Sequence, residues 1–119
     1  MTREILFRGK QVGNDKWVEG GYYENNTGKY IISPAFVAHL IIPSTVGQFT
    51  GLTDRNSTKI FDGDIVRYCD DWIGKIEYDS DSALFAVIFA DGDDDNFGRV
   101  SCGDCEVIGN IYDNPNRWR

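Results

Sequence analysis

The sequence predicts a mainly β fold in a single domain. It places a β annex over residues 1–45, a small closed or half-open barrel over residues 46–114 and a short tail over residues 115–119. A chain of 119 residues has room for one ordinary domain. Runs rich in β-branched and aromatic residues recur at short intervals between clusters of Gly, Asn and Asp, as strands and turns do. No helix-length stretch shows the apolar spacing i, i+3, i+4, i+7.

Four runs in the first half are predicted to be strands. They cover residues 5–8, 16–23, 29–32 and 40–42. The Asn-Asn-Thr-Gly sequence at residues 25–28 predicts a hairpin between the second and third runs. The Gly20-Gly21 pair inside the second run predicts a bulge or the close approach of another backbone.

Residues 34–40 are the best helix candidate of the chain. Ser33 is a good N-cap residue, and Pro34 suits the first helical position. Phe36 and Val37 also favour a strand, so an irregular segment is the alternative for these residues.

Five runs in the second half are predicted to form the barrel. They cover residues 64–68, 73–79, 84–89, 99–101 and 106–112. Closure would remove the exposed edges of a small antiparallel sheet. Residues 84–89 are apolar on both faces, which predicts a strand buried on both sides, and residues 91–96 are predicted to be a loop. The residues expected to fill the barrel are Ile65, Ile76, Phe85, Val87, Phe89, Val107 and Ile111.

The charge of the chain is negative and unevenly distributed. The formal net charge is −7, and residues 70–106 hold 11 acidic residues and 2 basic ones. Such a segment disfavours non-specific contact with phosphate backbones and with anionic membranes. The three cysteines and the absence of a long apolar run at the start lead us to expect free thiols and a cytoplasmic location.

Three motifs carry a resemblance to a known family. Residues 45–54 read Thr-Val-Gly-Gln-Phe-Thr-Gly-Leu-Thr-Asp, and residues 62–66 read Asp-Gly-Asp-Ile-Val. Residues 107–111 read Val-Ile-Gly-Asn-Ile and are followed by Asn114-Pro115. Together with Phe7–Lys10 and Trp17-Val18 near the start, and in this order over nearly the whole chain, the motifs resemble the YopX family of phage and prophage proteins.

The resemblance implies a mainly β protein with an SH3-like barrel in the C-terminal half, an irregular β N-terminal part and no established activity. The chain departs from the family pattern in the Asp-rich loop 91–96 and in the basic, aromatic end 117–119. The matching motif residues are expected to be structural, and they are Thr45, Val46, Gly47, Gln48, Thr50, Gly51, Leu52, Asp54, Gly63, Asp64, Ile65, Val66, Gly109, Asn110, Asn114 and Pro115.

The candidate metal and catalytic groups are sparse. Cys102 and Cys105 have the spacing of a metal knuckle, but a structural zinc site needs four ligands, and only Cys69 and His39 remain to complete one. We therefore expect two incidental thiols in a turn and no cofactor. Nothing in the sequence ties His39, the single histidine, to a nucleophile, so no catalytic residue is predicted.

The Asp-rich loop has the beginning of a calcium site. Asp91, Asp93 and Asp95 match the first oxygen ligands of a calcium loop, but Cys102 stands where the bidentate glutamate belongs. A solvated, self-repelling loop is the favoured interpretation. Weak cation binding stays open as the alternative.

Two functions remain from these observations. The first is a non-enzymatic, homo-oligomeric protein-interaction module, with a host or phage protein as a further partner, because strands in the annex would leave edges that another subunit can pair. The alternative is a small-barrel protein that binds nucleic acid or a nucleic-acid-processing host protein, with Tyr68, Trp72 and Tyr78 as stacking faces. The acidic segment makes nucleic acid the less favoured partner, and no membrane partner is expected.

Overall fold

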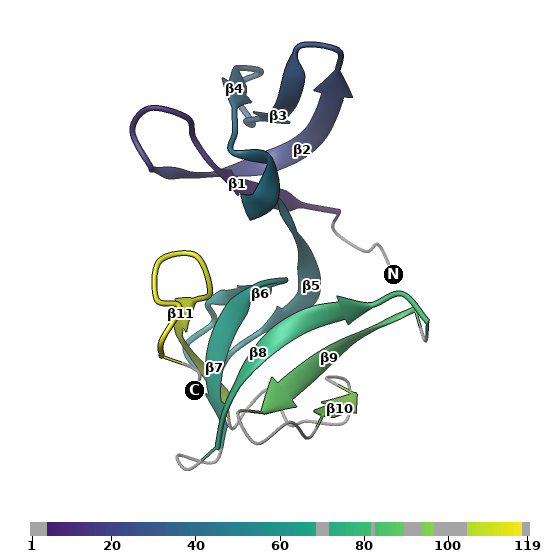
Figure 1. The fold of residues 1–119 in the computed structure, drawn as a ribbon, viewed down its shortest axis with the longest axis vertical. Helices are drawn as coiled ribbons and strands as arrows, with labels where there is room; N and C mark the ends of the chain where they lie inside the picture. The colour runs from purple at the N-terminus through teal and green to yellow at the C-terminus, as the bar shows by residue number, and fades with distance from the viewer. Residues whose placement is uncertain (1–4, 69–71, 82, 90–93, 97–104, 118–119) are drawn as a thin grey trace. The chain divides into compact units, whose positions relative to one another are not determined.

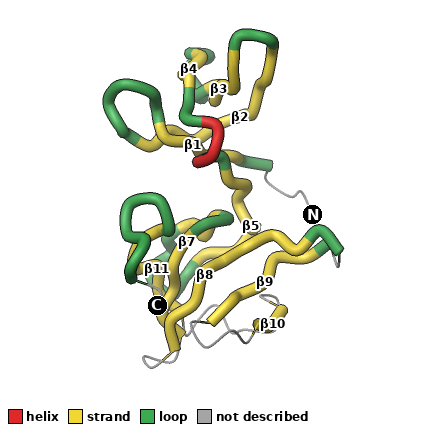
Figure 2. The backbone as a smooth tube through the Cα atoms, in the orientation of Figure 1, coloured by secondary structure: helices red, strands yellow, loops and turns green. Residues whose placement is uncertain are grey.

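The fold is mainly β, as the sequence predicts. A computed structural model of the chain describes residues 5–68, 72–81, 83–89, 94–96 and 105–117. Figure 1 shows their strands as arrows, and Figure 2 shows strands in yellow with the one short helical turn in red. The elements are β1 (Phe7–Lys10), β2 (Trp17–Asn25), β3 (Gly28–Ile32), β4 (Ala38–Leu40), η1 (Pro43–Thr45), β5 (Gly47–Thr53), β6 (Lys59–Phe61), β7 (Asp64–Tyr68), β8 (Trp72–Asp79), β9 (Leu84–Phe89), β10 (Asp94–Asn96) and β11 (Cys105–Asn110).

The described strands form two antiparallel sheets. The first has the order β4-β3-β2-β1-β5-β6, and the second has the order β10-β9-β8-β7-β11. The chain divides into two compact units, Met1–Gly51 and Leu52–Arg119, so β5 begins in the first and ends in the second. The division falls within β5, whereas the sequence prediction ended the annex at residue 45. None of the helices among the described residues has the length and hydropathy needed to span a bilayer.

Strand β2 organises the first unit by pairing with a different neighbour along each half. Its first half pairs with β1, from Lys10↔Trp17 to Phe7↔Gly20. Its second half pairs with β3, from Gly21↔Ile32 to Asn25↔Gly28. The predicted hairpin over β2 and β3 is therefore confirmed, and the change of partner falls at the glycine pair.

The Gly20 backbone lies against β3, as the glycine pair predicts. A Cβ placed on Gly20 would overlap the carbonyl oxygen of Ile32 and come within 3.2 Å of the Ser33 Cα. A Cβ on Gly21 would meet nothing within 4 Å. Only the first of these two glycines is required by the close approach.

The helix candidate at residues 34–40 is wrong. The Phe36 N–H donates to the Ser33 carbonyl at 2.8 Å and the Ser33 N–H donates to the Val37 carbonyl at 2.9 Å, so residues 33–37 form a tight turn. Ala38–Leu40 then returns as β4 against β3. Good capping residues begin either a helix or a turn, and the pairing of β4 with β3 decides between them here.

The second unit is built on β7, β8, β9 and β11. Strands β7 and β9 have the predicted bounds, and β8 begins one residue before the prediction. Residues 94–96 form strand β10 on β9, so the predicted loop 91–96 is wrong for this part. The predicted strand at 99–101 lies outside the described residues, as do residues 91–93.

Side chains from six strands form the core of the second unit. The buried members are Ile60, Val66, Ile76, Val87 and Cys105, and Leu52, Tyr68, Phe85, Phe89 and Val107 pack against them. Ile65 is fully buried but is not part of this cluster, and Ile111 is half-buried. The predicted burial of residues 84–89 on both faces is wrong, because Leu84 is 45 % exposed and only Val87 is fully buried.

The strand buried on both faces is β7, where Asp64, Ile65 and Val66 all exclude solvent. Within the described residues no pairing joins β10 to β11, so the sheet is open and the closed form of the barrel is not found. Alternation along a strand predicts its buried face but not whether the last strand pairs with the first.

We predict that Gly20→Ala destabilises the fold by about 3 kcal/mol, because the new methyl group would overlap a backbone oxygen that has no rotamer to move to. Gly21→Ala is the matched control, since its methyl group meets open space, and it should leave the free energy of unfolding within about 1 kcal/mol of the parent. Urea denaturation of both variants measures the difference. Equal midpoints would contradict the close approach.

Candidate functional site

The loop between β5 and β6, residues 54–58, is held by the carboxylate of Asp54. Its Oδ1 accepts hydrogen bonds from the backbone N–H groups of Asn56 at 2.8 Å and Thr58 at 2.9 Å. Its Oδ2 accepts from the backbone N–H of Val107 at 2.9 Å. Asp54 is only 6 % exposed. One side chain therefore shapes its own loop and fastens it to β11.

The Val107 contact falls beside an irregularity of β11. Val107 pairs with Val66, but the next pair is Gly109 with Ile65, so Ile108 is an extra residue on β11. Such a bulge interrupts the ladder locally. Asp54 supplies an acceptor for an N–H group at this point, and the Arg55 N–H donates to the Cys105 carbonyl at 3.0 Å nearby.

The environment of Asp54 favours its charged form. Burial raises the pKa of this carboxyl group, but the hydrogen bonds from the backbone N–H groups of Val107, Thr58 and Asn56 lower it. The Arg55 charge lowers it further, and the net result is a pKa below the ordinary value. Asp54 therefore serves as a charged hydrogen-bond acceptor for the backbone of its loop and of β11.

Glu106 forms a second charged cluster next to this loop. Its Oε1 accepts a hydrogen bond from Arg67 at 2.6 Å. Its Oε2 accepts from the Asn56 side-chain amide at 3.2 Å and lies 3.4 Å from the Arg55 guanidinium. The hydrogen bond from Asn56, and then that from Arg67, lower the pKa of Glu106. Both oxygens are thus engaged within the protein.

Two further motif segments build turns in the second unit. Gly63 has φ +92°, a conformation that favours glycine, and the buried Asp64 accepts a hydrogen bond from the Phe61 N–H at 2.8 Å. After β11, the Asn110 side chain accepts hydrogen bonds from the Tyr112 and Asp113 N–H groups at 3.0 and 2.9 Å.

Asn114 completes the turn after β11. Its Oδ1 accepts a hydrogen bond from the Asn110 N–H at 3.3 Å, and a Cβ on Gly109 would lie 2.5 Å from that oxygen. Glycine is therefore needed at position 109 for the side chain of Asn114 to fit. Pro115 follows in the same exposed turn.

The motif residues of the first unit hold η1 and β5. The hydroxyl of the buried Thr45 accepts a hydrogen bond from the Lys10 N–H at 2.9 Å and donates to the Ile42 carbonyl at 2.6 Å. Gly47 and Gln48 pair with β1, Gly51 has φ +90°, and Val46 and Thr50 are half-buried. These contacts stabilise backbone and form no reactive site.

The structure describes only some of the residues considered as metal ligands or catalytic groups. Cys69, Cys102, Asp91 and Asp93 lie outside the described residues. His39 lies on β4 opposite Ile31, and Cys105 is a buried thiol in the core of the second unit. Within the described ranges, no three His, Cys, Asp or Glu side chains gather closely enough to hold a metal ion.

The aromatic residues weighed as stacking faces are packed against other rings. Trp72 meets Phe89 with centroids 5.6 Å apart at 66°, and Tyr78 meets Phe85 at 5.3 Å and 70°. Trp72 and Tyr78 stay about half exposed. Tyr68 packs against the core.

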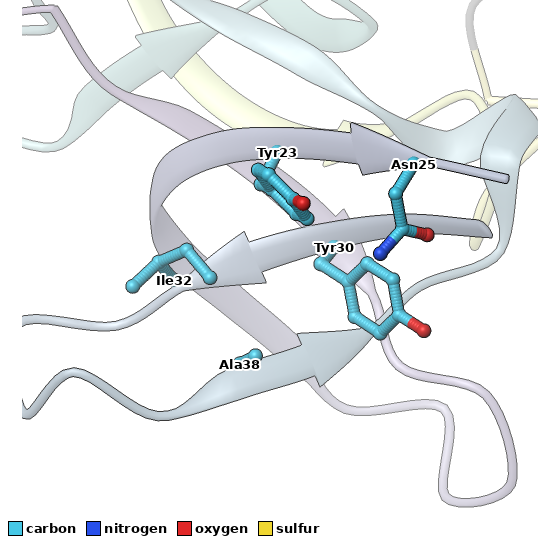
Figure 3. Close-up of a pocket in the computed structure, with 5 residues that line it drawn as sticks. All are labelled: Tyr23, Asn25, Tyr30, Ile32 and Ala38. Carbon is cyan, nitrogen blue, oxygen red and sulfur yellow. The ribbon is translucent and has the colours of Figure 1, made fainter. Parts of the chain in front are cut away.

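An apolar pocket in the first unit is the feature that sequence reasoning missed. Its volume is about 280 Å³. Tyr23 and Tyr30 face each other across β2 and β3, with ring centroids 6.2 Å apart. Figure 3 shows the five lining side chains on one side of the three strands, and we call them the tyrosine face: Tyr23, Asn25, Tyr30, Ile32 and Ala38.

Further exposed apolar side chains, which we call the extension, lie in the turn before β4 and on β4 itself. Phe36, in the turn before β4, is 91 % exposed, and Val37 and Leu40 are 49 % and 43 % exposed. Phe36 also has φ +62°, which is rare for a bulky residue. No residue of the tyrosine face or of this extension carries an ionised side chain. The tyrosine face and its extension are therefore apolar, partly exposed and without charge.

Part of the tyrosine face could be predicted from the sequence. Alternation places Tyr23 and Asn25 on one side of β2, and Tyr30 and Ile32 on one side of β3. The hairpin prediction already set these strands side by side. The missing information was the register, Tyr23↔Tyr30, and the placement of β4 beyond β3.

We predict that Asp54→Asn lowers the free energy of unfolding by about 3 kcal/mol, because buried N–H groups lose a charged acceptor. Asp81→Asn, in the exposed turn after β8, is the matched control and should have little effect. Thermal or urea denaturation at neutral pH measures both. Similar losses in the two variants would contradict the role assigned to Asp54.

The carboxylates of Asp54 and Glu106 make the stability of the fold depend on pH. Their pKa values in the folded protein lie below the ordinary 3.8 of Asp54 and 4.5 of Glu106, so the unfolded chain binds more protons in acid. The stabilisation is complete above about pH 5 and is lost as the pH falls through the folded-state values. Urea denaturation across this range should show a smaller acid-induced loss for Asp54→Asn than for the parent. Parallel curves would contradict it.

Comparison with known proteins supports the resemblance seen in the motifs. No curated protein matches the chain. The family model described as YopX protein matches residues 6–118. This match spans both units and every motif segment described above, and the chain belongs to the YopX family.

Proposed function

We propose that this protein is a non-enzymatic, homo-oligomeric protein-interaction module encoded by a phage or prophage and acting in the cytoplasm of the host. The observation that carries the proposal is the tyrosine face with its exposed extension. Apolar surface in water costs roughly 25 cal/mol for each Å² that association would bury. Phe36, Tyr23 and Leu40 leave much of such surface exposed in the first unit.

The hydrogen bonds accepted by two carboxylates of the second unit support a non-enzymatic role. A catalytic carboxylate needs an oxygen available to a substrate. Asp54 gives both oxygens to backbone N–H groups, and Glu106 gives both to Asn56, Arg55 and Arg67. These two groups are committed to holding a loop and a strand together.

In this proposal the second unit is a half-open, SH3-like barrel that serves as a rigid base. Support comes from the core, where Leu52 of β5, Ile60 of β6 and Cys105 of β11 meet Val66, Ile76 and Val87 of β7, β8 and β9. A flat sheet cannot bring side chains from so many strands to one cluster, whereas a curled one can.

The half-exposed rings of Trp72 and Tyr78 favour a second candidate, a small-barrel protein that binds single-stranded nucleic acid or a nucleic-acid-processing host protein. The surrounding segment opposes the direct form of this function, since residues 70–106 hold 11 acidic residues against 2 basic ones. Phosphate contacts normally supply most of the affinity in such complexes.

We predict that the purified protein forms an oligomer whose molecular mass exceeds the 13.4 kDa of one chain. Size-exclusion chromatography with multi-angle light scattering, at concentrations of tens of micromolar and below, should give an integral multiple of this mass that falls on dilution. A mass of one chain at every concentration would overturn the oligomeric part of the proposal.

We also predict no binding to labelled single-stranded or duplex DNA at low salt, because the acidic segment repels phosphate. Fluorescence anisotropy at low and moderate salt measures this. A salt-sensitive rise in anisotropy with the parent protein, lost in Trp72→Ser, would favour the second candidate.

A further inference from the structure

We infer that the Phe36 side chain of one copy of this chain occupies the tyrosine face of a second copy. This inference rests on the proposed function and names the surface that would serve it. The first unit presents both halves of such a contact, since the exposed ring follows β3 in the turn and the pocket lies on β2, β3 and β4.

The pocket has the right chemistry and size for a phenyl ring. Its walls offer the Tyr23 and Tyr30 rings and the aliphatic groups of Ile32 and Ala38, and its volume is about 280 Å³. The rings are already tilted by 43° to one another, so a third ring can meet their edges or faces. Asn25 is the one polar residue of the lining, and its Oδ1 is held by the N–H groups of Thr27 and Gly28.

The absence of charge on the contacting surfaces permits a second copy as the occupant. The chain carries a net charge of −7, so a contact that brought acidic groups of two copies together would be unfavourable. The tyrosine face, Phe36, Val37 and Leu40 contain no ionised side chain. Copies can therefore approach here without placing like charges in contact.

The area of the face agrees with the centre of an interface. Aromatic side chains bury about 150–250 Å² each, so Tyr23 at 50 % exposure and Phe36 at 91 % together leave roughly 200–350 Å² to be covered. A standard interface buries about 800 Å² on each partner. The two rings would form its apolar centre, where hot-spot residues lie, and Val37, Leu40 and the flanking strands would form the rest.

The backbone of Phe36 gives a variant that separates folding from association. The backbone of Phe36 is strained at φ +62°. Phe36→Gly therefore removes the ring and also relieves the backbone strain. We expect the folded monomer to be as stable as the parent or slightly more so, while association weakens by roughly 30-fold or more, as for a hot-spot residue. Ser57→Gly is the matched control, because Ser57 has φ +66° in the second unit and bears no large side chain.

The pocket side is tested by Ala38→Glu. Ala38 is exposed and lines the pocket, so the folded monomer tolerates the carboxylate but the ring of a second copy would desolvate it. Light scattering at a series of concentrations compares the parent, Phe36→Gly, Ala38→Glu and Ser57→Gly. Circular dichroism and urea denaturation report whether each variant is folded.

The outcomes are distinct. Association lost in Phe36→Gly and Ala38→Glu but kept in Ser57→Gly supports the inference. An oligomeric parent whose mass is unchanged in the first two variants overturns the inference and leaves the proposed function standing. A parent that is monomeric throughout overturns both.

A cross-linking experiment gives the contact directly. Photoreactive benzoylphenylalanine replaces Phe36, and the protein is mixed with a ¹⁵N-labelled parent before irradiation. Mass spectrometry should find the probe joined to labelled peptides that contain Tyr23, Tyr30 or Ala38. Cross-links only to other regions of the labelled copy would overturn the inference.

Discussion

The carboxylate of Asp54 is the contact on which the second unit depends. It is a buried charge, and burying a charge is unfavourable unless hydrogen bonds replace its water. Three backbone N–H groups do so here, two from its own loop and one from β11. Because the loop follows β5 and precedes β6, this single side chain ties β5 and β6 to a strand 53 residues later in the sequence.

The other buried polar residues act in the same way at other turns. Among the described residues the buried polar side chains are those of Thr45, Asp54 and Asp64, and all three belong to the family motifs. Each bonds a backbone group within its own turn, and Thr45 also bonds Lys10 of β1. Strands so short bury little apolar surface each, so their turns must be specified by hydrogen bonds and by positive-φ glycines such as Gly63. A motif rich in turn residues is what such a fold requires.

The parts of the fold that follow from local rules were predictable. Apolar runs that follow polar turns predicted the bounds of β7 and β9, the Asn-Asn-Thr-Gly turn predicted the β2–β3 hairpin, and the glycine pair predicted the close approach at Gly20. The parts set by long-range pairing were not. Residues 34–40 satisfy helix-start rules, and only their pairing with β3 makes them a turn and a strand. Closure of the sheet and the residues buried on both faces of β7 depend likewise on neighbours distant in sequence.

The tyrosine face shows the same division between local and long-range information. The sequence shows runs rich in aromatic residues but not where their side chains meet, because Tyr23, Tyr30 and Ala38 come together only once the register of three strands is known. The sequence predicts a helix or an irregular segment at Phe36, since nothing in a sequence signals a bulky side chain at φ +62°.

The conformation of Phe36 is consistent with the inferred contact to a second copy. A left-handed backbone costs roughly 1–2 kcal/mol for a residue with a Cβ, and exposure leaves the ring without the burial that normally offsets such strain. Within one folded copy, the backbone strain at Phe36 is therefore not offset by burial of its ring. In the inferred contact, another surface would bury the ring. A ring that the turn already holds outward loses little entropy on binding. The strained turn and the apolar pocket, both in the first unit, would then form the two sides of one contact between copies.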